Sequence, residues 1–202
     1  EALKSGADDF LTKPIRPDKL IIRINAKSER SRNLRFLMER DSLTGLLNHA
    51  NLKERISIEM MRVKRSGGNL CYAMIDADHF KNVNDTHGHL AGDHVLKSLS
   101  RMLQDRLRRT DIIGRYGGEE FGVILINTDA DNAFRVMEEV RKNFALVKHK
   151  SDEDEFYVTF SCGIASFSEC ETPSELNDTA DKAMYEAKTS GRNRTIVHKK
   201  SL

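Results

Sequence analysis

Hydrophobic and polar positions follow helical and strand-like spacings in turn along most of the chain. Residues 18–40 contain no proline or glycine and favour one long helix. Beyond them, helical spacing of apolar residues alternates with short apolar runs, which predict strands. The expected elements are, in order, helix 48–64, strand 70–75, a short helix near Asn82, helix 92–107, strands 111–116 and 121–126, helix 130–147, strand 156–167, helix 173–188 and strand 195–198. This order predicts an α/β (α+β) domain.

The same spacing predicts which side chains are buried. The expected apolar face of helix 48–64 is Leu52, Ile56, Ile58, Met60 and Val63, and that of helix 92–107 is Val95, Leu96, Leu99, Met102 and Leu103. On one side of strand 156–167 we expect Phe156, Val158, Phe160 and Cys162.

The helix at 18–40 carries a partly apolar seam. Steps of four and three residues connect Leu20, Ile24, Lys27, Ser31, Leu34 and Met38. Such a seam is typical of a coiled coil, but its middle is polar. A dimerisation helix and a solvated linker helix are both compatible with this pattern.

Composition restricts the function only broadly. The 202 residues include 33 basic and 31 acidic side chains, and the formal net charge of +2 gives no reason to expect a nucleic-acid polymer or an anionic membrane as partner. Three cysteines without metal-like spacing favour reduced thiols, and therefore a cytoplasmic protein. No apolar run approaches the roughly 20 residues that cross a bilayer. We expect a soluble chain.

Two glycines and two acids form the turn between strands 111–116 and 121–126. Gly117 and Gly118 are typical of a hairpin, because glycine adopts positive φ without steric cost. The adjacent Glu119 and Glu120 repel each other unless a cation lies between them. Taken alone, this is compatible with a solvated acidic turn.

A second acidic segment lies about forty residues upstream. Asp76 and Asp78 follow the apolar strand 70–75, where carboxylates commonly cap the next helix. If they face the acidic hairpin, the oxygen atoms together suit a hard divalent cation. The pairing of the two segments predicts a metal site more strongly than either segment does.

Four ordered motifs resemble the GGDEF family of diguanylate cyclases. They are the opening motif Asp41–Asn48, the segment Asp76–Asp93, the signature Gly117–Phe121 and the closing segment Asp181–Arg194. The resemblance implies the ferredoxin-like βαββαβ palm core of nucleotide cyclases, preceded by a linker helix. It implies condensation of two GTP into cyclic di-GMP and two pyrophosphates by a two-metal mechanism. Each domain would supply half an active site, so a homodimer is expected.

The resemblance also implies roles for individual residues. Asp76, the carbonyl of Ala77, Glu119 and Glu120 would bind Mg²⁺ (or Mn²⁺). Glu119 is the first choice for accepting the proton of the 3′-hydroxyl, and Glu120 is the rival. Asp93 and Asn84 would recognise guanine, whose N–H donors match these acceptors. The phosphate contacts would be the backbone of His79 and Phe80 and the side chains of Lys81, Lys188 and Arg192, with Lys81 also counted as catalytic.

Most of these residues have ordinary alternative explanations. Without the motifs, Asn84 and Asp93 would be a turn residue and a helix cap, and Lys188 and Arg192 would be basic residues that end a helix. No Gly-x-x-x-x-Gly-Lys-Ser/Thr segment is present, which excludes a P-loop ATPase. One departure from the family is His49, which stands where arginine is usual.

An Arg-x-x-Asp pattern precedes the hairpin. By resemblance, Arg108 and Asp111 would bind cyclic di-GMP as an inhibiting product. Outside this context the same pattern would be a surface pair. Its position before the signature favours the product site.

Residues 1–40 are expected to be a separate piece, followed by the cyclase domain over 41–202. The segment Glu1–Pro14 resembles the end of a response-regulator receiver domain, with Lys13 as its phosphate-contacting lysine and Lys13–Pro14 as a candidate cis bond. We therefore expect a response-regulator output domain in bacterial signalling. The alternatives are a catalytically silent receptor for GTP or cyclic di-GMP and, more weakly, a phosphorylation-responsive scaffold.

Overall fold

The computed structural model describes residues 16–151 and 154–198, without the side chains of residues 33–37. Its contacts divide the chain into two units, residues 1–38 and 39–202. Helix α1 (Pro17–Glu39) confirms the long helix expected there. Of its predicted seam, Leu20 is half-buried, whereas Ile24 and Met38 are exposed. The expected receiver segment, including Lys13 and Pro14, lies outside the described residues.

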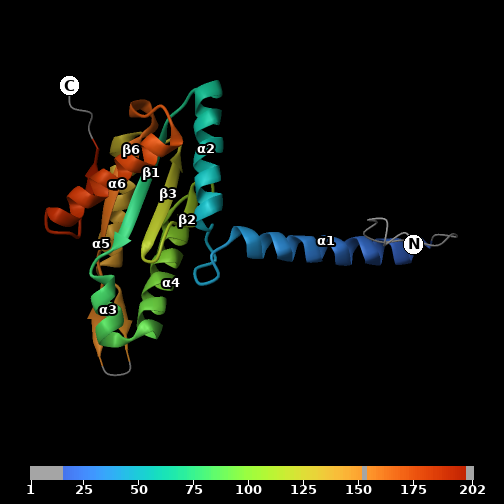
Figure 1. Cartoon of the computed structure of the whole chain (residues 1–202), viewed down its shortest axis with the longest axis horizontal. Helices are drawn as coiled ribbons and strands as arrows, with labels where there is room; N and C mark the ends of the chain where they lie inside the picture. The colour runs from blue at the N-terminus through green and yellow to red at the C-terminus, as the bar shows by residue number, and fades with distance from the viewer. Residues whose placement is uncertain (1–15, 152–153, 199–202) are drawn as a thin grey trace. The chain divides into compact units, whose positions relative to one another are not determined.

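The second unit is built on a five-stranded sheet in the order β2-β3-β1-β6-β7. Neighbouring strands are antiparallel except β6 and β7, which are parallel. The elements of this unit are α2 (His49–Ser66), β1 (Leu70–Ala77), α3 (Phe80–His87), α4 (His89–Arg106), β2 (Ile112–Arg115), β3 (Glu120–Ile126), α5 (Ala130–Phe144), β4 (Lys148–Lys150), β5 (Glu155–Tyr157), β6 (Phe160–Ser166), a 3-10 turn (Phe167–Glu169), α6 (Pro173–Thr189) and β7 (Thr195–Val197). The βαββαβ order with the β2-β3-β1-β6 arrangement confirms the ferredoxin-like core (Figure 1).

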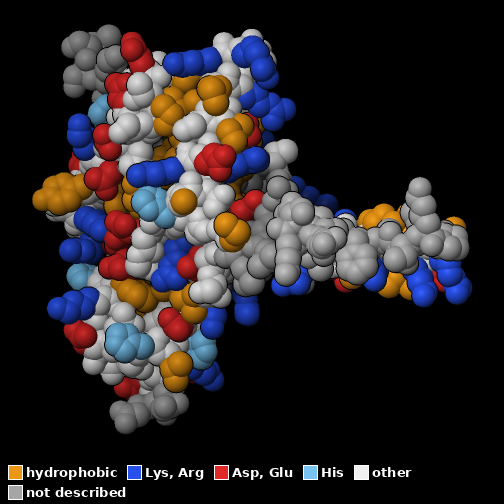
Figure 2. All heavy atoms as spheres, turned by 45° about the vertical axis from the view of Figure 1, so that its right-hand side comes forward, with side chains coloured by type: hydrophobic (Ala, Val, Ile, Leu, Met, Phe, Trp, Pro, Cys, Tyr) orange, Lys and Arg blue, Asp and Glu red, His pale blue; other side chains and the backbone are white. Residues whose placement is uncertain are grey.

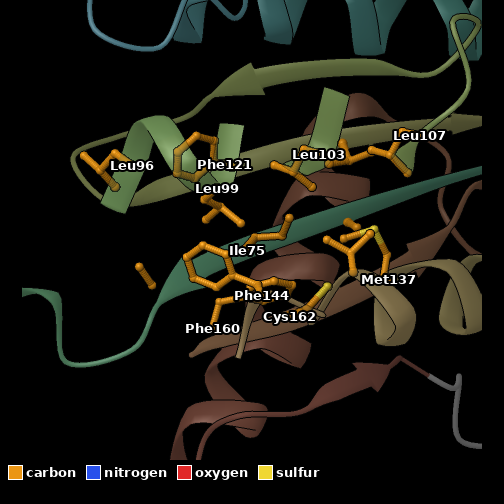
Figure 3. Packing of buried hydrophobic residues seen from close by; sticks show 14 of the residues in the cluster. Ile75, Leu96, Leu99, Leu103, Leu107, Phe121, Met137, Phe144, Phe160 and Cys162 are labelled. Carbon is orange, nitrogen blue, oxygen red and sulfur yellow. The ribbon is translucent and has the colours of Figure 1, made fainter. Parts of the chain in front are cut away.

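Hydrophobic clusters cover both faces of the sheet. Alternate strand residues pack with α4 and α5 on one face, where Ile75, Phe121 and Phe160 lie fully buried. Figure 3 shows this packing, with Leu96, Leu99 and Leu103 of α4 and Met137 and Phe144 of α5 in the same cluster. The opposite strand residues pack with α2 and α6. The sheet is therefore held from both sides, and its strand ends are fixed.

The strand expected over residues 156–167 is two strands, so that prediction was wrong. Glu155–Tyr157 pairs with Lys148–Lys150 in a separate two-stranded sheet, and β6 begins only at Phe160. The chain leaves the extended ladder at Thr159, whose carbonyl and hydroxyl both bond Asp78. The pattern of apolar residues did not reveal this break, and it gave no indication of the short strand at 148–150.

Smaller corrections concern helix ends and one apolar position. Helix α4 begins at His89, three residues before the expected start, because Gly88 (φ 82°) separates it from α3. Helix α5 ends at Phe144 rather than at residue 147. Ile58 is 38% exposed. It lies two residues after the buried Ile56, which is a rotation of about 200° around the helix, so its side chain points away from the core.

The surface of the second unit carries mixed charge. Figure 2 shows lysine and arginine interspersed with acidic side chains over the visible face, as the near-balanced composition predicts. Within the part of the chain that the structure describes, no helix combines the length and apolarity needed to span a bilayer.

Candidate active site

The acidic hairpin connects β2 to β3 and is held from within by Arg115. The Arg115 guanidinium donates to the carbonyl of Gly117 at 3.2 Å and to that of Gly118 at 2.7 Å. Neither glycine has positive φ, so the conformational reason expected from the sequence was wrong. A side chain at Gly117 would instead lie 2.7 Å from Glu120 Oε2. Gly117 therefore leaves the space that the end of the Glu120 side chain occupies.

Arg115 also ties the hairpin to the opening motif. Its Nη1 lies 3.2 and 3.1 Å from the two carboxylate oxygens of Asp41, and both side chains are 19% exposed. Asp41 accepts further bonds from the backbone and hydroxyl of Thr44. Burial opposes ionisation of Asp41, but the Thr44 bonds and the Arg115 charge outweigh it and lower its pKa. The opening motif thus holds the signature hairpin in place.

The hairpin brings its carboxylates to the end of β1. Asp76 is directly opposite Glu120 across the β1–β3 ladder, and the Ala77 amide donates to the Glu119 carbonyl at 3.3 Å. Lys188 of α6 completes the cluster, with its Nζ 2.6 Å from Asp76 Oδ2. The structure therefore joins four predicted residues from three distant segments, namely Asp76, Glu119, Glu120 and Lys188, which we call the acidic cluster.

The acidic cluster carries more negative charge than its one lysine neutralises. Burial, opposed by Lys188 and reinforced by repulsion from Glu119 and Glu120, raises the pKa of Asp76 to about 6. Burial likewise raises the pKa of Glu120, with repulsion from Asp181 and Glu119 adding to the shift and Lys188 opposing it. Partly buried carboxylates that repel one another favour a cation between them.

Asp78 does not share this environment, although it ends the same strand. Its carboxylate is 4% exposed and accepts bonds from the hydroxyls of Thr159 (2.6 Å) and Ser161 (2.7 Å) and from the Asn193 amide (3.0 Å). Asp78 is a structural acceptor. The sequence-based suggestion that it joins Asp76 in binding a cation is therefore corrected.

The predicted guanine-binding residues lie on α3 and α4, two helices that pack on each other. A Cβ on Gly92 would lie 2.0 Å from Asn84 Oδ1, so the Asn84 side chain lies directly over this glycine. Asp93 is the next residue along α4 and is half-buried. The lack of a side chain at Gly92 thus leaves the space that Asn84 occupies.

The predicted phosphate contacts surround the same end of β1. His79 adopts a left-handed conformation (φ 56°) that turns the chain into α3, which begins at Phe80. Lys81 is exposed on the first turn of α3, and Arg192 is exposed in the loop after α6. Lys188 is engaged by Asp76 rather than left free.

Arg108 and Asp111 lie at the other end of the β2–β3 hairpin. Ile112 pairs with Ile124, whereas Arg115, next to the acidic turn, pairs with Phe121. The Asp111 carboxylate accepts from the backbone amides of Arg108 (3.0 Å) and Ile126 (3.3 Å). A cavity of about 240 Å³ lies here, and both residues are among those that line it.

Tyr116 and His49 are site residues that sequence reasoning did not assign. Their rings lie 4.4 Å apart, and the Tyr116 hydroxyl accepts from Asn177 of α6 at 3.1 Å. His49 is also close enough to lower the pKa of Glu120 slightly, as the last of several influences. The position where the family usually carries arginine thus faces the hairpin, and that departure was the one available indication.

The donor types of the acidic cluster fit a magnesium or manganese ion. All three acidic residues offer carboxylate oxygens, the ligands that hard cations prefer. Burial raises the pKa of Asp76 and that of Glu120, and repulsion from neighbouring carboxylates adds to both shifts. Among the described residues, no three histidine, cysteine or acidic side chains are already gathered at metal-binding distance. The chemistry of the residues fits such an ion.

Comparison with known proteins places this site in a family context. Residues 38–194 match the family model described as "Diguanylate cyclase, GGDEF domain". Diguanylate cyclase DgcP of Pseudomonas aeruginosa is 43% identical over 157 residues, which are 78% of this chain and 23% of that protein. Response regulator PleD of Caulobacter vibrioides is 34% identical over 211 residues, covering 97% of this chain and 46% of PleD.

Solved structures agree with these matches. The coiled coil and GGDEF domain of DgcB from Caulobacter crescentus, solved in complex with cyclic di-GMP, superpose with a TM-score of 0.84 at 25% identity, covering 98% of this chain and 100% of that one. The present chain spans less than half the length of the two curated relatives it is compared with.

Proposed function

We propose, from the premise that this chain belongs to the GGDEF family, that it condenses two molecules of GTP into cyclic di-GMP and two pyrophosphates. The observation that carries this proposal is the acidic cluster, in which Asp76, Glu119 and Glu120 are all present and insufficiently neutralised. A protein that only needed a stable turn would gain nothing from burying these charges together.

The acidic cluster would hold the metal ions of the reaction. Asp76, the Ala77 carbonyl, Glu119 and Glu120 are the proposed ligands for Mg²⁺ or Mn²⁺. Such ions lower the pKa of the attacking hydroxyl and neutralise charge on the α-phosphate. Glu119 is the proposed acceptor of the hydroxyl proton. Glu120 remains its rival, since its raised pKa also suits a proton acceptor.

Guanine would bind between α3 and α4. Asp93 would accept the N1–H and N2–H donors of the base, and Asn84 would contact the N2/N3 side. The close approach of Asn84 to Gly92 supports this, because Gly92 immediately precedes Asp93 in α4. Adenine carries an acceptor at N1, so it would leave Asp93 unpaired, which can discriminate by about 10⁴-fold.

The triphosphate would bind where α3 and the loop after α6 meet the end of β1. The amides at His79 and Phe80 open a helix, where anions are favoured. Lys81, Lys188 and Arg192 supply the cations. In this proposal Lys188 leaves Asp76 for a phosphate oxygen when the charge of Asp76 is neutralised by metal.

Two such half-sites must face each other, so we propose a homodimer. Helix α1 exposes Ile21, Ile22 and Ile24, at 58%, 67% and 54%. Exposed branched side chains on a long helix suit contact with a second copy. The similar DgcB structure includes a coiled coil beside its GGDEF domain. The linker-helix alternative predicts a monomer at all concentrations.

The cavity at Arg108 and Asp111 is the proposed site of product inhibition. Asp111 is held by two backbone amides, so its role there would be to shape the turn as well as to contact the ligand. Arg108 is exposed beside it. Arg108→Ala should relieve inhibition by added cyclic di-GMP.

The N-terminal segment gives the proposed biological setting. The match to response regulator PleD covers 97% of this chain, including part of the region before the GGDEF domain. This supports the proposal that residues 1–40 come from a receiver domain with its linker helix, and that the enzyme is a cytoplasmic output domain of bacterial two-component signalling.

Turnover of GTP tests the proposed function directly. The protein is incubated with GTP and Mg²⁺, and cyclic dinucleotide and pyrophosphate are quantified, with ATP and the Glu119→Gln variant as controls. We expect product from GTP alone and none from the variant. Binding of GTP or cyclic di-GMP without turnover would instead establish a silent receptor.

A further inference from the structure

Asp78 is the centre of a hydrogen-bond network that the proposed chemistry does not use. Its three hydrogen-bond donors are distant in sequence, at separations of 81, 83 and 115 residues. Thr159 immediately precedes β6, Ser161 belongs to β6, and Asn193 belongs to the loop after α6. Asp78 thus connects the end of β1 to two other segments.

Helix α5 extends this network through Arg141. This arginine is 9% exposed and makes a two-pronged pair with Glu138, at 2.8 and 2.5 Å. Its remaining Nη1 donates to the side-chain oxygen of Asn193. The Glu138 bonds fix the plane of the guanidinium, so the third bond has a defined direction.

The loop that this network holds has an unfavourable backbone conformation. Arg192 and Asn193 both have positive φ, 61° and 46°. Left-handed conformations cost free energy for residues other than glycine and persist only when their surroundings fix them. Here the Asn193 amide bonds Asp78 and its side chain bonds Arg141, so both bonds act on one residue. The neighbouring Arg194 carbonyl accepts from the Cys162 amide at 2.9 Å.

We propose that Asp78, Arg141 and Asn193 are positioning residues that hold Arg192 at the substrate triphosphate. The inference rests on the proposed function, because Arg192 is one of its phosphate contacts. None of the three side chains needs to touch substrate. Asp78 already accepts three hydrogen bonds within the protein, and Arg141 is linked to the loop through Asn193.

Substitutions at Asn193 test the hydrogen bond to Arg141 separately from the backbone conformation of the loop. Asn193→Gly removes the acceptor for Arg141 while keeping a residue that adopts positive φ easily. It lies in an exposed loop, so the fold should survive. Asn193→Asp retains an oxygen for Arg141 and also tolerates the left-handed region. Lys142→Ala is the matched control, since it removes an exposed cation of α5 that lies 3.7 Å from Glu138.

Kinetics with GTP and Mg²⁺ separate positioning from general stability. We expect Asn193→Gly to raise KM about fivefold and to change kcat less than about twofold, as loss of uniform binding predicts. Asn193→Asp and Lys142→Ala should stay within about twofold of the native KM. In the Arg192→Ala background, Asn193→Gly should add almost nothing, because both changes remove the same contact.

A binding assay distinguishes failure of this inference from failure of the proposed function. Calorimetry uses the full chain, Mg²⁺ and GTP with an α,β-methylene bridge, which cannot release pyrophosphate. Affinity about fivefold weaker for Asn193→Gly than for the native chain supports positioning. Native-like affinity of that variant, or additive effects with Arg192→Ala, would overturn the inference alone. Absence of nucleotide binding by the native chain would overturn both.

Discussion

Asp76 and Asp78 stand two residues apart at the end of β1, in opposite electrostatic surroundings. Asp78 receives three hydrogen bonds from two hydroxyls and a backbone amide. Asp76 has one ammonium group and two neighbouring carboxylates, and burial raises its pKa to about 6. The Asp78 carboxylate is hydrogen-bonded within the fold, whereas the Asp76 carboxylate has a single cationic partner beside two other acids. Both side chains are buried, so the comparison teaches that hydrogen-bond partners and neighbouring charges, rather than burial, distinguish the two acids.

The largest expected effect is on turnover when Asp76 is neutralised. Asp76→Asn should lower kcat by roughly 10³-fold. This exceeds the loss of about 10–100-fold that is typical when a residue behind a metal ligand is changed. The melting temperature of the variant should not fall, because the replaced carboxylate is repelled by its neighbours. Asp105→Asn, an exposed change on α4, is the control. Native-like turnover of Asp76→Asn would remove the distinction between the two aspartates.

Asp78 should show the reverse pattern, with stability affected first. Asp78→Ala leaves two hydroxyls and one backbone amide without their acceptor, and should lower the free energy of unfolding by about 3 kcal/mol. Denaturant unfolding measures this. Ser161→Ala removes one donor and should cost about 1 kcal/mol. Equal stability of Asp78→Ala and the native protein would contradict the structural role.

The pH dependence of stability sharpens the same comparison. The ordinary pKa of Asp76 is 3.8 and its folded value is about 6, so the metal-free folded state binds a proton more readily than the unfolded state. At about 1.4 kcal/mol per pKa unit, ionisation of Asp76 costs the fold about 3 kcal/mol at pH 7. As the pH falls from 6 towards 4, Asp76 is protonated in the folded state and this destabilisation disappears.

The measurement is the unfolding free energy of native protein minus that of Asp76→Asn. This difference should rise as the pH is lowered from 7 to 4, by up to about 3 kcal/mol. Subtraction removes the contributions of other groups, such as His149, whose burial lowers its pKa. A difference that stays flat over this range would show that Asp76 is not desolvated in solution.

The smallest expected effect concerns Tyr116, which borders the acidic hairpin without belonging to it. Tyr116→Phe removes the bond from Asn177 but keeps the ring beside His49. Stability should fall by about 1 kcal/mol or less, and turnover should change less than about threefold. A loss of turnover comparable to that of Asp76→Asn would place the Tyr116 hydroxyl in the chemistry.

The sequence predicted the parts of the molecule whose patterns are local. Helices α2, α4 and α6 and strands β1, β2 and β3 appear where periodicity places them, because their apolar residues recur at the spacing of the element. The motifs also identified Asp76, Glu119, Glu120 and Lys188, which the structure brings to one cluster. Their proposed roles still await experiment.

Contacts between distant segments could not be predicted in this way. The three donors of Asp78 lie more than 80 residues away, so no local pattern distinguishes it from Asp76. The break at Thr159 has the same origin, since that residue leaves the strand to bond Asp78. The space beside Gly117 depends on where Glu120 folds back, which the spacing of two glycines does not reveal.

The affinity for a GTP analogue in the presence and absence of a divalent cation tests the central claim most directly. The native protein and Asp76→Asn are titrated with the α,β-methylene analogue, with Mg²⁺, with Mn²⁺ and with chelator. Our account predicts that either metal tightens binding to the native protein by at least about tenfold and leaves Asp76→Asn unchanged. Equal affinity of the native protein with and without metal would contradict it.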